Sequence, residues 1–216
     1  MVSVARIFSN YERTNMNVPF VPGHFYHVFN RGNNSQTIFF NEENFRYFIR
    51  QFDKYLDNFI DVFAYCLLFN HFHFLIRVKE EKELLRMPSF GKMASLNVNR
   101  IITNQFRRLF ISYSMAINKQ EGRTGSLFQK NFKRKWIKNE KYLTTTIYYI
   151  HRNPIHHKHS SRFDDYQWSS YKSIITNSKS KLKRDEVLKW FDGEKEFIRF
   201  HEDVLHTDDM LKYIIE

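Results

Sequence analysis

The sequence predicts an α+β fold in one main domain, followed by a small helical extension. Segments with strand and helix patterns alternate in the order β-α-β-β-α-β-α along the chain. Apolar residues make up 42% of the 216 positions, which is enough to bury a core. Together these observations favour a ferredoxin-like or RNA-recognition-like antiparallel sheet with helices packed on one face.

The first strand is expected at 24–30, HFYHVFN, before a Gly/Asn turn at 31–36. A helix is expected next, at 42–57, because Asn41 can cap it and apolar residues recur there at helical spacing. These apolar residues are Phe45, Phe48, Ile49, Phe52 and Leu56. Residues 1–20 show no clear period and are expected to form a lead-in to the domain.

Residues 61–78, DVFAYCLLFNHFHFLIRV, predict two apolar strands joined at a Phe-Asn dipeptide. The second strand carries His71 and His73. Side chains at positions i and i+2 of a strand point to the same side, so both imidazoles are expected on one face of the sheet. Phe72 and Phe74 are then expected on the other face.

A polar surface connection is expected at 79–90, and a long amphipathic helix over 93–118. A glycine-containing break follows, and a short strand is expected near 133–137 in a basic, aromatic stretch. The next helix, over 139–152, can be capped by the asparagine at its start. Pro154 marks the end of this helix or a kink in it.

The last part of the chain contains a polar linker and one or two short amphipathic helices. There is no internal repeat and no low-complexity tract. We therefore divide the chain into an N-terminal arm (1–21), a main α+β domain (22–176) and a helical C-terminal extension (177–216). The sequence does not indicate what the extension does.

The net charge is +11, from 34 Lys and Arg against 23 Asp and Glu. Such a charge predicts an anionic partner, with nucleic acid the first candidate and a membrane surface the second. No run of apolar residues is long enough for a membrane-spanning helix, and the first 17 residues lack the apolar core of a signal peptide. The single cysteine, Cys66, fits a reducing compartment, so we expect a cytoplasmic protein.

Two residues of the last predicted helix are candidates for chemistry together with His71 and His73. Tyr149 and Asn153 are four residues apart, which places them on one face of a helix. Imidazoles and an amide oxygen can hold a divalent cation, and a tyrosine can act as a covalent nucleophile. A structural alternative stays open, with the histidines hydrogen-bonded in a core strand and the tyrosine near an ordinary helix end.

Five basic residues precede this helix and could neutralise phosphates. They are Lys130, Lys133, Arg134, Lys135 and Lys138. The alternative is a solvated basic edge strand. We expect the interleaved aromatic residues Phe128, Phe132 and Trp136 to pack into the core more than to stack on bases. Arg31, after the first strand, is a further candidate for contact with nucleic acid. The His-rich turn at 156–159 is not expected to hold a second metal ion.

Five motifs stand in a fixed order along the chain. They are YHVFNRGNNSQTIF at 26–39, NHFHFLI at 70–76, GSLFQKNFK at 125–133, YIHRNP at 149–154 and YQWSSY at 166–171. Together they resemble the motifs of the REP-associated tyrosine transposases, which belong to the HUH (His-hydrophobic-His) single-strand DNA transposases. The resemblance covers about residues 22–175. One such motif is a weak signal, whereas several in the family's order are a strong one.

The resemblance implies that the main domain is a single-strand DNA endonuclease and strand transferase. It implies that His71, His73 and Asn153 bind Mg²⁺ or Mn²⁺, and that Tyr149 attacks a DNA phosphodiester to form a 5′-phosphotyrosine. Some insertion-sequence relatives carry Gln where this chain has Asn153. Tyr148 is a rival nucleophile, but on a helix it points about 100° away from its neighbour.

The partner implied by the resemblance is single-stranded or hairpin DNA, which would place the protein at the nucleoid and away from membranes. The alternative function is a non-catalytic module that binds single-stranded nucleic acid and uses the histidines structurally. The sequence leaves open the DNA sequence recognised, the choice of divalent metal, and whether the protein serves a mobile element or its host. It also leaves open whether the protein is a monomer or a homodimer.

Overall fold

The computed structural model describes residues 18–87, 97–176 and 178–204. Its centre is a four-stranded antiparallel sheet with the strand order β2-β3-β1-β4. The strands are β1 (Phe25–Arg31), β2 (Ile60–Leu68), β3 (His71–Val78) and β4 (Lys133–Ile137). With one long helix after β1 and another after β3, they form a β-α-β-β-α-β unit, so the predicted fold class is confirmed.

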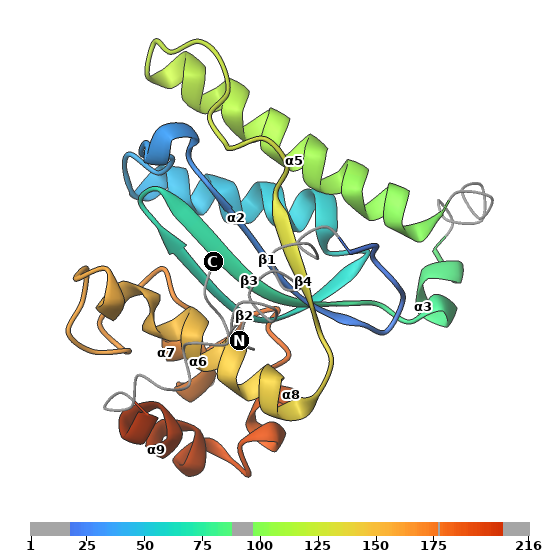
Figure 1. Cartoon of the computed structure of the whole chain (residues 1–216), viewed down its shortest axis with the longest axis vertical. Coiled ribbons are helices and arrows are strands. Elements are labelled where there is room, and N and C mark those ends of the chain that lie inside the picture. Colours follow the sequence, from blue (N-terminus) through green and yellow to red (C-terminus); the bar gives the residue numbers. More distant parts are fainter. Residues whose placement is uncertain (1–17, 88–96, 177, 205–216) are drawn as a thin grey trace, which may run out of the picture.

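Helices α2 (Glu42–Leu56) and α5 (Val98–Gln120) cover one face of the sheet (Figure 1). Asn41 caps α2 as predicted, since its side-chain oxygen accepts a hydrogen bond from the backbone N–H of Asn44. The core beneath the two helices is rich in phenylalanine, and Phe52 stacks on Phe74 with 4.3 Å between the ring centroids. Burial of these large rings fixes the helices on the sheet.

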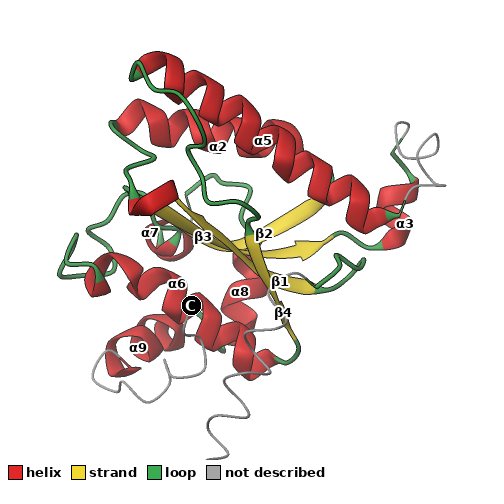
Figure 2. Cartoon of the chain, turned by 45° about the horizontal axis from the view of Figure 1, so that its top comes forward, coloured by secondary structure: helices red, strands yellow, loops and turns green. Residues whose placement is uncertain are grey.

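Helices also cover the opposite face of the sheet (Figure 2). This differs from the prediction, which has helices on one face only. These helices are α6 (Glu140–His156), α7 (Tyr171–Ile175), α8 (Arg184–Trp190) and α9 (Glu194–Val204). The reason lies in the two strands β2 and β3, which are buried along nearly their whole length. Phe72 and Phe74 pack toward α2 and α5, whereas Leu75 and Cys66 pack toward α6, so both faces need a cover.

The C-terminal helices belong to this second core. Val187 of α8 and Phe197 of α9 share one hydrophobic cluster with Tyr148 of α6. The linker before α8 lies along the edge of β2, where the N–H of Lys183 donates to the carbonyl oxygen of Val62 at 2.9 Å. The segment thereby covers part of an exposed strand edge. The domain boundaries expected near residues 22 and 177 stay predictions.

Some element boundaries differ from the prediction. The expected start of the long helix at residue 93 lies outside the described residues. Short helices occur where loops were expected, namely the 3₁₀ turn η1 (Asn33–Ser35) and α3 (Glu81–Leu85). α6 continues through Pro154 to His156. In the part of the chain that the structure describes, no helix is long and apolar enough to cross a membrane.

A buried pair of histidines joins α9 to α6. Nδ1 of His151 and Nε2 of His201 lie 3.0 Å apart. His201 donates through Nδ1 to the carbonyl oxygen of Phe197 at 2.8 Å, and Nε2 of His151 lies 2.8 Å from Oγ of Ser170. Burial lowers the pKa of His201 to about 3 and holds that of His151 well below its ordinary value.

We expect stability to fall as the pH drops below about 6.5, because these rings stay neutral in the folded protein and take up protons once it unfolds. The contribution is complete above the ordinary histidine pKa and is lost as the pH falls toward about 3. Replacing His201 with Phe should lower the slope of the unfolding free energy against pH by up to about 1.4 kcal/mol per pH unit.

Urea unfolding of His201→Phe at several pH values between about 4.5 and 7 checks this slope. His156→Gln, a change at an exposed position of α6, is the matched control and should keep the wild-type slope. An unchanged slope in His201→Phe would contradict the assignment.

Candidate functional site

The two histidines of β3 point to the face of the sheet that α6 covers. His71 is 3% exposed and His73 is 0% exposed, with 5.2 Å between the ring centroids. The ring of Tyr149, on α6, meets the ring of His73 edge to face at 5.5 Å. Asn153 follows one helical turn later and is buried next to His71. The fold therefore brings together the four residues predicted for chemistry.

The imidazole of His71 is oriented by its neighbour in the chain. Its Nδ1 lies 2.6 Å from Oδ1 of Asn70, and Nδ2 of Asn70 donates to the carbonyl oxygen of Ser35 at 3.1 Å. This second bond turns the amide so that its oxygen faces the ring, and His71 then donates through Nδ1. Nε2 of His71 is buried without a close hydrogen bond among the described residues, and the side chain of Asn153 is the polar group that acts on the ring from α6.

The Asn153 side chain is also oriented by the helix. Its Nδ2 donates to the carbonyl oxygen of Tyr149 at 2.8 Å, so the amide oxygen is the Asn153 atom that can serve as an acceptor or a metal ligand. Burial is the largest influence on His71 and lowers its pKa, and the charges of His157 and Arg31 lower it further. Hydrogen bonding to the Asn153 side chain raises it by less, so the pKa of His71 falls to about 3.

These residues fit a divalent cation. Nδ1 of each β3 histidine faces a hydrogen-bonding partner, Asn70 for His71 and His27 for His73, which leaves Nε2 as the nitrogen for a metal. Burial holds both pKa values low, so both rings are neutral as ligands must be. Across the described ranges no three His, Cys, Asp or Glu residues gather to hold a metal, so the third ligand on offer is the amide of Asn153.

His27 of β1 is a site residue that the sequence did not reveal. Its Nε2 lies 3.0 Å from Nδ1 of His73, and its ring meets Tyr149 edge to face at 5.8 Å. Burial, and then the charge of Lys135, lower its pKa to about 3. The i, i+2 spacing of His27 and Phe29 signals a shared face, but the sequence does not tell which face or which partner strand.

His157 reaches the site because α6 does not end at Pro154. Its ring lies 4.7 Å from that of His71. Tyr149, Asn153 and His157 follow one another at intervals of four residues, so a continuous helix places all three on one face. A helix end or kink expected at Pro154 does not predict that His157 shares a face with Tyr149. Pro154 lacks a backbone N–H, and α6 tolerates the loss of that one hydrogen bond near its C-terminus.

The basic residues of β4 are divided by strand alternation. Lys133 pairs with Phe29 of β1, and Lys135 pairs with His27, so both lie on the face that carries the histidines. Lys130 and Lys138 are exposed. The two lysines of β4 are therefore the ones placed beside the imidazoles.

Arg134 points to the opposite face, which corrects its prediction as a DNA-binding residue. It is 7% exposed, and its Nε donates to the carbonyl oxygen of Val18. Its Nη2 donates to Oδ1 of Asn99 at 3.2 Å, and the guanidinium lies 4.4 Å from the ring centroid of Phe20. Arg134 therefore holds the N-terminal lead-in against α5 and is not available to a phosphate.

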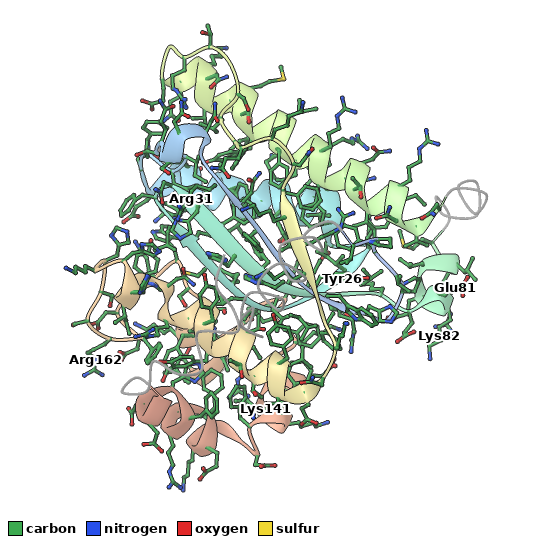
Figure 3. All side chains as sticks on the ribbon, in the orientation of Figure 1. Tyr26, Arg31, Glu81, Lys82, Lys141 and Arg162 are labelled. Atoms are coloured by element: carbon green, nitrogen blue, oxygen red, sulfur yellow. The ribbon has the colours of Figure 1, made fainter. Side chains whose placement is uncertain are left out.

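A cavity of about 240 Å³ opens beside His71. Its lining residues are Phe29, Asn30, Arg31, His71, Gln129 and Lys133. Lys141 lies at the N-terminal end of α6, and Arg31 lies on the side of the molecule where α6 ends (Figure 3). The cationic side chains of Arg31 and Lys133, next to the buried imidazole of His71, suit the binding of a phosphate group.

The fold and the site define an α+β protein in which a His-X-His strand faces a tyrosine on a helix packed against the sheet. No family model and no curated protein matches the sequence. Among solved structures, a REP-associated tyrosine transposase bound to a REP hairpin matches with a TM-score of 0.50 and 17% identity, over 76% of this chain and 86% of that chain. A bacterial tRNA(His) guanylyltransferase-like protein in complex with GTP matches at a TM-score of 0.37 and 11% identity, over 76% and 79% of the two chains. The first match shows a shared fold.

Replacing Arg134 with Met should lower the free energy of unfolding by on the order of 2 kcal/mol. The change removes the Arg134 donor from the Val18 carbonyl and removes the cation from the ring of Phe20. The Asn99 amide oxygen loses one of its donors and keeps the backbone N–H of Phe20. Chemical denaturation measures the difference. Lys130→Met, at an exposed position, is the control and should stay within about 0.5 kcal/mol of wild type; equal stability of both variants would refute the structural role.

Proposed function

We propose that this protein is a metal-dependent single-strand DNA endonuclease and strand transferase that acts on hairpin-forming repeat DNA through a 5′-phosphotyrosine. The observation that carries the proposal is the ring of Tyr149 against that of His73, on the helix face that also holds Asn153. The fold shared with a tyrosine transposase and the net charge of +11 support it. The proposed enzyme works in the cytoplasm, at the nucleoid.

In the proposed reaction the phenolic oxygen of Tyr149 attacks the phosphorus of a DNA phosphodiester. The bond from phosphorus to the 3′ oxygen breaks, and the phenolic proton ends on the 3′-hydroxyl that leaves. One ester bond replaces another, so attack of a 3′-hydroxyl on the phosphotyrosine can rejoin strands without an energy source. An ordinary phenol is mostly protonated at neutral pH, so the phosphate itself has to be activated.

The proposed ligands of Mg²⁺ or Mn²⁺ are His71, His73 and Asn153. The cation would stabilise the negative charge that develops on the phosphate during attack. Arg31 and Lys133 line the cavity beside His71. In this proposal they would hold a phosphate of the same strand.

The other basic residues proposed for DNA extend this surface. Lys135 lies on the face of β4 that also carries the histidines. Lys130 and Lys138 are exposed and lie within five residues of Lys135 in the sequence. Trp136 was expected in the core but is 41% exposed, with the ammonium of Lys138 5.2 Å from its ring centroid. The aromatic residues Phe128 and Phe132 are buried in the core, as expected from the sequence, and do not take part in base stacking.

The neighbouring tyrosine is not placed for this chemistry. Tyr148 is 0% exposed, and its ring packs against Phe163, Phe200 and His201 on the side of α6 that faces the C-terminal helices. A nucleophile has to reach the phosphate of a bulky substrate, so we assign the role to Tyr149, which is partly exposed.

Changing both His71 and His73 to Ala should abolish cleavage of end-labelled hairpin or single-stranded DNA while most binding remains, because Lys and Arg residues supply the affinity. Denaturing gels with Mg²⁺ and with a chelator measure cleavage, and a filter-binding titration measures affinity. His156→Gln serves as the control at an exposed histidine. Cleavage by the double variant in excess chelator would exclude the metal-dependent reaction.

Tyr149→Phe should bind DNA and metal but form no covalent protein–DNA adduct, since it loses only the hydroxyl group. Tyr148→Phe, the same change one residue earlier, should still form the adduct. Denaturing protein gels with labelled DNA and Mg²⁺ detect it, and peptide mapping locates it. An adduct on Tyr148, or one that persists in Tyr149→Phe, would show a wrong assignment; DNA binding by wild type with no cleavage under any metal would favour the non-catalytic binding module.

A further inference from the structure

His27 and His73 share one hydrogen bond between ring nitrogens, with 3.0 Å between Nε2 of His27 and Nδ1 of His73. A neutral imidazole carries a single proton, so one ring donates and the other accepts. The direction of this bond decides whether Nε2 of His73 carries a proton or a lone pair. Only a nitrogen with a lone pair can bind a metal ion.

His71 has a similar bond whose direction is fixed. Oδ1 of Asn70 lies 2.6 Å from Nδ1 of His71, and Nδ2 of Asn70 is committed to the carbonyl oxygen of Ser35. An amide oxygen can only accept, so Nδ1 of His71 carries the proton and Nε2 keeps the lone pair. That Nε2 is buried and makes no close hydrogen bond in the part of the chain that is described, where Asn153, the third proposed ligand, is the polar side chain that acts on the ring.

We propose that His27 and Asn70 are positioning residues, which hold His73 and His71 in the Nδ1-protonated tautomer before any metal binds. His27 accepts through Nε2 as Asn70 accepts through its amide oxygen. Both Nε2 atoms then keep the lone pair that a cation requires. The inference rests on the proposed function, and it adds to it the residues that prepare the ligands.

The packing around His27 keeps the bond in place without a metal. His27 is 1% exposed and stacks on Phe29 at 4.8 Å and on His73 at 5.2 Å between centroids. It lies on β1 opposite Leu75, and therefore reaches His73 as a diagonal neighbour across the two strands. Tyr149 of α6 adds an edge-to-face contact to the ring at 5.8 Å between centroids.

The direct test is ¹⁵N NMR of the histidine rings in the metal-free protein at neutral pH. The chemical shift of each ring nitrogen reports whether it carries a proton. We expect Nε2 of both His71 and His73 to be unprotonated. A proton on Nε2 of His73 would overturn the role of His27, and a proton on Nε2 of His71 would overturn that of Asn70. The measurement needs neither DNA nor cleavage.

A second test measures the affinity for Mn²⁺ by calorimetry, without DNA. His27→Phe keeps a ring in the same space but removes the acceptor, and should weaken Mn²⁺ binding about 10- to 100-fold. His27→Gln offers an amide oxygen near the position of Nε2 and should restore most of the affinity. The matched control is His24→Phe, a histidine packed on Trp136, which should bind Mn²⁺ like wild type.

Equal Mn²⁺ affinity of wild type and His27→Phe would overturn the inference, as would a failure of His27→Gln to recover more affinity than His27→Phe. Failure of the proposed function has a different signature. In that case the Mn²⁺-loaded wild type forms no adduct with DNA, while His27→Phe still loses affinity for the metal.

Discussion

The alternation of side chains along β3 determines both the core under α2 and α5 and the candidate site under α6. Phe72 and Phe74 face α2 and α5, where they join a core of stacked aromatic rings. His71 and His73 face α6, and hydrogen bonds at Nδ1 make their burial tolerable. A shift of the strand by one residue would exchange the two sets, which would remove the core and the site together.

Features that depend on spacing within one segment could be predicted from the sequence. The strand at 133–137, the capping of α2 by Asn41 and the shared helix face of Tyr149 and Asn153 are such features. Contacts between segments could not, because strand order and register are set by the packing of the whole chain. For that reason His27 was not recognised, although it lies within hydrogen-bonding distance of His73.

Two sequence expectations change where tertiary packing outweighs a local rule. Pro154 favours a helix end or a kink, and α6 continues past it to His156, which places His157 next to His71. Arg134 belongs to a basic cluster in the sequence, yet strand alternation buries it on the face away from Lys133. The same alternation therefore divides β4 into a side that serves stability and a side that faces the site.

In the proposed enzyme, β3 and α6 together form a metal site in a protein whose sheet is otherwise a packed core. Anomalous diffraction from crystals soaked in Mn²⁺ can locate the ion. We expect one Mn²⁺ ion bonded to Nε2 of His71, Nε2 of His73 and the amide oxygen of Asn153, within reach of the Tyr149 hydroxyl. Fully soaked crystals with no ion between these side chains, or with an ion bound through Nδ1 of either histidine, would contradict it.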